Sequence, residues 1–100
     1  MSADDDLERV DLERAAELFK ALSATSRLAL LRTLGAGPMT VTRLAELSGL
    51  SQPLVSQHLR ILRSAGLVAV ERVGREANYS VADRHVSHIV DDAVAHVHEE

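Results

Sequence analysis

The sequence contains no cysteine and no tryptophan, and its 100 residues include only one phenylalanine and one tyrosine. The absence of cysteine excludes disulfides, iron–sulfur clusters, thiolate zinc sites and a cysteine nucleophile. No apolar run approaches the roughly 18 residues that a transmembrane helix requires, so no membrane partner is expected. The acidic start of the chain lacks the basic and apolar segments of a signal peptide, which indicates a cytoplasmic protein.

The length predicts a single domain, which we place at residues 7–100, with residues 1–6 expected to be disordered. A chain of this size buries only about 60–70% of its unfolded surface, so a lone monomer would be marginally stable. Hydrophobic residues nevertheless make up 46% of the sequence. The surplus of apolar surface favours a homodimer.

The net charge of −4 hides a strong segregation of charge along the chain. Residues 1–17 carry a net charge of −5, residues 18–82 carry +5, and residues 83–100 carry −4. A basic stretch of this kind is the electrostatic footprint of a site for a polyanion. The acidic total therefore does not exclude nucleic acid as a partner.

Apolar spacing predicts helices over residues 11–22 and 26–34, with Ser23 and Thr25 as capping residues before the second helix. A short third helix follows, capped by Thr40 or Thr42. The turn Ser48-Gly49-Leu50 then leads into a helix over residues 51–65, which Ser51 caps and Gly66 ends. Two short helices joined by a three-residue glycine turn predict a helix-turn-helix.

The two faces of the 51–65 helix differ in chemistry. Val55, Leu59 and Leu62 are spaced to pack inward. The outward face is polar and basic and carries no acid; its members are Gln52, Ser56, Arg60 and Arg63, with Gln57 beside them. Glutamine, serine and arginine side chains hydrogen-bond base edges and phosphates in a major groove. This helix is therefore the candidate recognition helix.

The spacing of apolar residues changes from a helical to an alternating pattern after Gly66. This pattern predicts a β-hairpin over residues 67–81. Arg72 and Arg75 lie near its tip, so the hairpin is a candidate wing that reaches an adjacent groove or phosphates. A final amphipathic helix is predicted over residues 84–98. The fold class is therefore mainly α with one β-hairpin.

Several motifs resemble the winged helix-turn-helix of the ArsR/SmtB repressors. They are LSQPLVSQHL at residues 50–59, LRSAGLV at 62–68, RVGR at 72–75, Tyr79, and ATSRL at 24–28. The resemblance implies a homodimer through the first and last helices that binds double-stranded operator DNA. In that arrangement Gln52, Ser56 and Gln57 would read bases, and Thr40, Arg60, Arg72 and Arg75 would hold phosphates. His58 would either contact DNA or pack beneath the wing.

The final helix contains candidate metal ligands. His85 and His96 share a helix face but are eleven positions apart, about 16 Å along the axis, so one helix cannot bring both to one ion. Two antiparallel copies can. The predicted site combines Asp83 and His85 of one subunit with His96 and Glu99 of the other. The spacing D-x-H-x10-H-x2-E resembles that of the zinc-sensing branch of the family.

Two nitrogens and two carboxylates suit Zn(II), while Co(II) or Ni(II) would also fit. His88 and Asp92 form a weaker rival chelate, and His98 is the one hint of the longer ligand set of the nickel sensors. The resemblance implies a repressor that releases its operator on binding metal and so turns on efflux or storage genes. The alternatives are a repressor of the same fold with a non-metal trigger, and a helical protein–protein interaction module. No catalytic motif indicates an enzyme.

Overall fold

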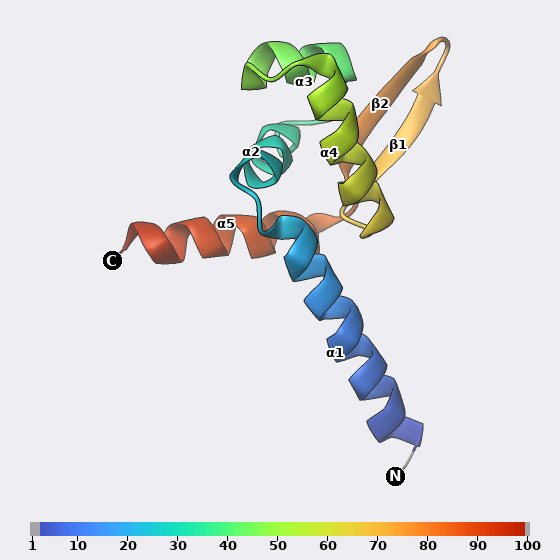
Figure 1. Ribbon diagram of the computed structural model, residues 1–100, viewed down its shortest axis with the longest axis vertical. Coiled ribbons are helices and arrows are strands. Elements are labelled where there is room, and N and C mark those ends of the chain that lie inside the picture. The colour runs from blue at the N-terminus through green and yellow to red at the C-terminus, as the bar shows by residue number, and fades with distance from the viewer. Residues whose placement is uncertain (1–2, 100) are drawn as a thin grey trace.

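A computed structural model describes residues 3–99 as five helices and one antiparallel hairpin (Figure 1). The fold class is as predicted. The helices are α1 (Ala3–Leu22), α2 (Thr25–Leu34), α3 (Val41–Ser48), α4 (Gln52–Ser64) and α5 (Arg84–His98), and the hairpin joins β1 (Val68–Val73) to β2 (Glu76–Val81) between α4 and α5.

The core lies where α2, α3 and α4 pack together. Leu30, Leu44 and Leu62 are completely buried there, one from each helix. Leu67 closes the core at the base of the hairpin, and α5 adds Val90 from its first half. The three helices and the hairpin therefore form one body.

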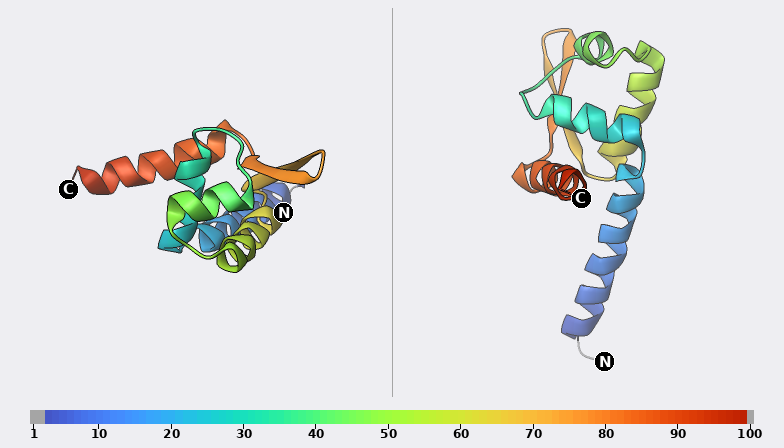
Figure 2. Two further views of the ribbon diagram at one scale, coloured as in Figure 1. Left: turned by 90° about the horizontal axis from the view of Figure 1, so that it is seen from above. Right: turned by 90° about the vertical axis from the view of Figure 1, so that its left-hand side faces the viewer.

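Two helices extend from this body as arms. The N-terminal part of α1 runs away from it, and the last turns of α5 run in a different direction (Figures 1 and 2). The radius of gyration is 15.1 Å, whereas a compact domain of this length would have about 13 Å. Within residues 3–99, no helix is both long and apolar enough to cross a membrane.

The hairpin is tied to the helices by a short bridge. Val68 pairs with Val81 and Val73 with Glu76, which leaves Gly74-Arg75 as a two-residue loop. Met39 donates its N–H to the Tyr79 carbonyl at 2.9 Å and accepts from the Tyr79 N–H at 2.8 Å. This pairing fixes the middle of β2 beside the start of α3.

The start of the chain differs from the expectation of disorder over residues 1–6. Helix α1 begins at Ala3 rather than near Asp11, with Asp4, Asp5 and Asp6 in its first turn. Acidic side chains stabilise a helix N-terminus through the helix dipole, which accounts for a helix that buries no apolar side chain there. Met1 and Ser2 lie outside the described residues.

The predicted caps of the second helix were wrong. The N-cap of α2 is Ala24, without a side-chain hydrogen bond. Ser23 instead donates its hydroxyl to the Lys20 carbonyl at 2.7 Å, so it serves the end of α1. Thr25 is the first residue of α2 rather than its cap.

Candidate nucleic-acid interface and metal ligands

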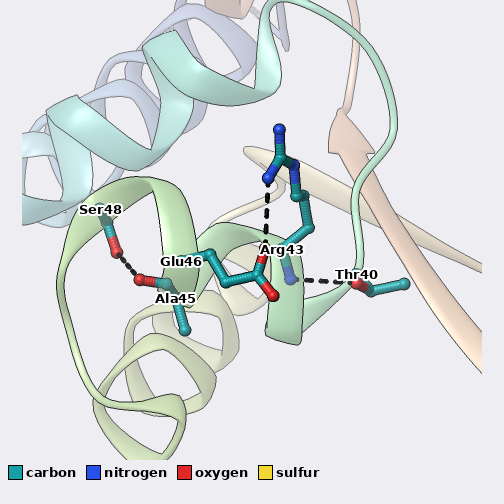
Figure 3. A network of polar contacts seen from close by, with 5 residues as sticks. All are labelled: Thr40, Arg43, Ala45, Glu46 and Ser48. Atoms are coloured by element: carbon teal, nitrogen blue, oxygen red, sulfur yellow. Dashed lines mark hydrogen bonds and ion pairs between the residues drawn. The ribbon is translucent and has the colours of Figure 1, made fainter.

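The turn between α3 and α4 is built as the sequence predicts. Thr40 accepts a hydrogen bond from the Arg43 N–H at 3.2 Å and caps α3 (Figure 3). Gly49 ends α3 with a left-handed φ of 75°, a conformation that favours glycine. Ser51 then accepts from the Leu54 N–H at 3.3 Å and caps α4. Local chemistry thus sets where the candidate recognition helix starts.

Helix α4 divides into the two predicted faces. Val55, Leu59 and Leu62 are buried, as expected. The polar residues of the other face are exposed: Gln52, Ser56, Gln57, Arg60 and Arg63. The exposed face therefore offers hydrogen-bonding and cationic groups with no acid from the same helix.

The arginines of α4 and of the hairpin are not neutralised. Within residues 3–99, the ion pairs involve other bases, such as Arg43 with Glu46 at 3.2 Å (Figure 3) and Arg32 with Asp91 at 3.7 Å. Four exposed arginines of α4 and the hairpin have no carboxylate partner there: Arg60, Arg63, Arg72 and Arg75. An unpaired guanidinium is available for a phosphate.

A groove of about 490 Å³ lies between α4 and the hairpin. Arg60, Arg63 and Ser56 line it from the helix, and Tyr79 lines it from β2. Neither Arg63 nor Tyr79 was among the residues predicted to bind DNA. The signal for Arg63 was present, because it follows Arg60 by one helical turn. Tyr79 is placed by its position opposite Val70 in the hairpin and by its bridge to Met39.

His58 faces helix α2. It is half-buried, and its Nδ1 accepts a hydrogen bond from Arg27 Nε at 3.3 Å. The recorded hydrogen bond of this side chain is to α2 and not to the hairpin. His58 therefore joins two helices of the body.

The four predicted metal ligands form two separate pairs at the ends of α5. Asp83 caps the helix, and its Oδ1 accepts from the N–H groups of His85 and Val86 at 2.9 and 3.2 Å. His85 is exposed beside it. His96 and Glu99 are exposed at the other end of the helix, about 16 Å away along its axis.

One chain alone therefore does not assemble the metal site. Within residues 3–99, no three histidine or acidic side chains are grouped closely enough to hold a metal ion. The donor types still fit Zn(II), because the imidazoles and the Glu99 carboxylate are exposed and Asp83 caps α5 through Oδ1 alone. Any site built from these four residues requires two chains.

The arms carry apolar side chains that the body does not cover. On α1, Leu7, Leu12 and Phe19 are more than half exposed, and so is Val97 on α5. Large apolar side chains gathered on two projecting helices indicate an interaction surface.

Comparison with known proteins agrees with this geometry. Residues 25–70 match the family described as "Bacterial regulatory protein, arsR family". The chain is 48% identical over 89 residues to the HTH-type transcriptional repressor SmtB of Mycobacterium tuberculosis, which covers 89% of this chain and 66% of the repressor. The chain thus spans just under two thirds of that relative's length. It is 45% identical over 83 residues to the HTH-type transcriptional regulator NmtR of the same organism, covering 83% and 69% of the two chains.

A solved structure is similar over the whole chain. The homodimeric winged helix-turn-helix DNA-binding domain (fragment 1-100) Mb0332 from Mycobacterium bovis superposes with a TM-score of 0.88 at 28% identity. The match covers 100% of this chain and 93% of that domain. The similarity includes both arms, because α1 and α5 lie within the matched length.

Proposed function

The chain belongs to the arsR family of bacterial regulatory proteins, and we propose that it is a dimeric repressor that releases operator DNA when it binds Zn(II). Its family and its relatives are transcriptional regulators, so it is a regulator and not an enzyme. A protein that acts on operator DNA works in the cytoplasm. The observation that carries the proposal is the acid-free face of α4 beside the unpaired arginines of the wing.

DNA binding is proposed through α4 and the hairpin together. Gln52, Ser56 and Gln57 are exposed on α4 and would reach base edges in the major groove. Thr40, Arg60, Arg72 and Arg75 would hold phosphates, and Arg63 would join them from the groove beside Tyr79. A dimer would place its two α4 helices in successive major grooves, about 34 Å apart.

Dimerisation is proposed through α1 and α5, whose exposed apolar side chains would be covered by the second copy. Asp83 and His85 of one subunit would then approach His96 and Glu99 of the partner subunit, and these four side chains would hold the ion. A bound Zn(II) would link the two subunits, because its four ligands come from both. Symmetry gives two such sites in each dimer.

The contacts between α5 and the body offer a route by which metal binding on α5 would affect the recognition helix. Helix α5 packs on α2 and buries Val86 and Val90. Arg32 of α2 also pairs with Asp91 of α5 at 3.7 Å. A change in the angle between the two α5 helices would therefore move both bodies and alter the separation of the recognition helices. Metal changes DNA affinity only if the two arrangements bind the ion differently.

The test is DNA binding with and without zinc at one salt concentration, using a duplex that the protein selects from a random library. Zinc should weaken binding by the natural chain about 5- to 150-fold, the usual range of coupling between two sites. The His96→Ala variant should bind DNA and ignore zinc. The His98→Ala variant, altered two positions away on the same helix, should respond like the natural chain.

The outcomes separate the parts of the proposal. If no duplex is selected, DNA binding is wrong. If zinc leaves the affinity of the natural chain unchanged, zinc sensing is wrong while DNA binding stands. A response to Co(II) or Ni(II) alone would replace zinc by that metal.

A further inference from the structure

The side chain of Arg27 joins three helices. It lies on α2 and is half-buried. Its Nε donates to Nδ1 of His58 on α4 at 3.3 Å, and its Nη1 donates to the carbonyl of Ala21, in the last turn of α1, at 3.2 Å. The arm helix α1 is thereby connected to the candidate recognition helix through one guanidinium.

The bond to His58 has a defined direction. A guanidinium has donors and no acceptor, so Nδ1 of His58 must be the unprotonated nitrogen. Lysine could not replace Arg27, because an ammonium on a flexible stem lacks the planar fork that serves two acceptors in fixed directions.

Packing between α1 and α4 is incomplete near this contact. A hollow of about 610 Å³ lies between α1, α2 and α4, lined by Lys20 and Ala21 of α1, Arg27 of α2, and Ile61 of α4 among others. Side chains that do not interlock leave the angle between two helices loosely defined. Arg27 lines this hollow, and its two hydrogen bonds link α1 and α4 through α2.

We propose that Arg27 is a positioning residue for DNA binding, which sets the recognition helix against the dimer helix α1 through His58. The inference rests on the proposed function, because α1 pairs the subunits and α4 enters the groove. In a dimer, an error in this angle is repeated in both subunits and changes the separation of the two recognition helices. Arg27 acts through His58 and does not itself touch DNA.

The experiment measures affinity for the selected duplex as a function of salt for Arg27→Lys, His58→Leu and the double variant. Each single change should weaken binding about three- to tenfold, the scale of one intramolecular hydrogen bond. The double variant should bind no more weakly than the weaker single variant, because both changes break one connection. His58→Asn, whose amide oxygen can replace Nδ1 as acceptor, should recover much of the loss. Arg9→Lys, at an exposed arginine whose side chain pairs with Asp6, is the matched control.

The salt dependence separates positioning from direct contact. A residue that neutralises a phosphate contributes about one to the slope of log affinity against log salt. Arg27→Lys should leave the slope unchanged, and so should its removal in Arg27→Gln. A slope reduced by about one in Arg27→Gln, additive losses in the double variant, or unchanged affinity in both single variants would each overturn the proposal.

Amide hydrogen exchange tests the connection between Arg27 and α4 without DNA. Arg27→Lys should accelerate exchange of the α4 amides relative to Arg9→Lys, while global stability is checked by thermal unfolding. If no duplex can be selected, the proposed function fails, yet faster exchange in α4 alone still supports the connection. Equal exchange in the two variants refutes it.

Discussion

Two variants that each lose zinc binding should recover part of it when their chains are mixed and form dimers together. The candidate metal ligands of α5 lie in two pairs about 16 Å apart along the helix, and no single chain groups three of them within residues 3–99. His85→Ala damages the first pair and leaves His96 with Glu99. His96→Ala damages the second pair and leaves Asp83 with His85.

The expected recovery follows from symmetry. A dimer of one His85→Ala chain and one His96→Ala chain has one site that lacks both histidines. Its other site is formed from the two undamaged pairs and is complete. Random exchange of subunits makes half of the dimers mixed, and each mixed dimer has one complete site of two. The mixture should therefore bind about one quarter of the zinc that the natural dimer binds.

The assay is equilibrium dialysis against a chelator strong enough to strip the single variants, after the two chains are co-expressed or refolded together. A mixture of His96→Ala with Glu99→Ala is the internal control, because both changes damage the same pair and no combination gives a complete site. No recovery in the first mixture would refute a site shared between subunits. Recovery in the control mixture would show that the ligands are paired differently.

Three further changes test the body of the protein. Leu44→Ala removes a side chain that is fully buried and should lower the free energy of unfolding by about 2–5 kcal/mol. The thermal midpoint should then fall by about 10 °C or more. A fall of only a degree or two in a melting curve would place Leu44 outside the core. Ser51→Ala removes the acceptor for the Leu54 N–H and should cost about 1 kcal/mol in denaturant unfolding, whereas Ser51→Gly should cost only a few tenths. Arg63→Ala should reduce the salt slope of DNA binding by about one; an unchanged slope would remove Arg63 from the phosphate contacts.

The helix-turn-helix could be predicted because its determinants are local. Ser51, Gly49 and the spacing of Val55, Leu59 and Leu62 act within a few residues of one another, and the structure has each of them in its expected role. Helix caps and the spacing of apolar residues depend on positions close together in the sequence, so they can be predicted from the sequence alone.

Features that depend on distant partners could not be predicted in this way. Periodicity detects a helix through the face that it buries, so it missed the part of α1 near Asp6, which extends from the body. The bond between Arg27 and His58 joins positions 31 residues apart. The bridge from Met39 to Tyr79 spans a longer separation, and it ties the strand that carries Tyr79, at the groove beside α4, to the segment before α3.

One dimer arrangement would account for both the candidate metal site and the uncovered apolar surface. The first half of α5 buries Val86 and Val90 in its own subunit, while Val97 near the end remains exposed. An antiparallel second copy would bring its packed half beside this unpacked half, and the same register would bring His85 to His96 of the partner subunit. Covering the apolar end and completing the ligand set would then be one event. An ion that binds only the assembled pair stabilises that arrangement by mass action, by about 2.7 kcal/mol at a hundredfold excess over its dissociation constant. Metal concentration could in this way select one angle between the subunits, and the angle is the property on which operator binding would depend.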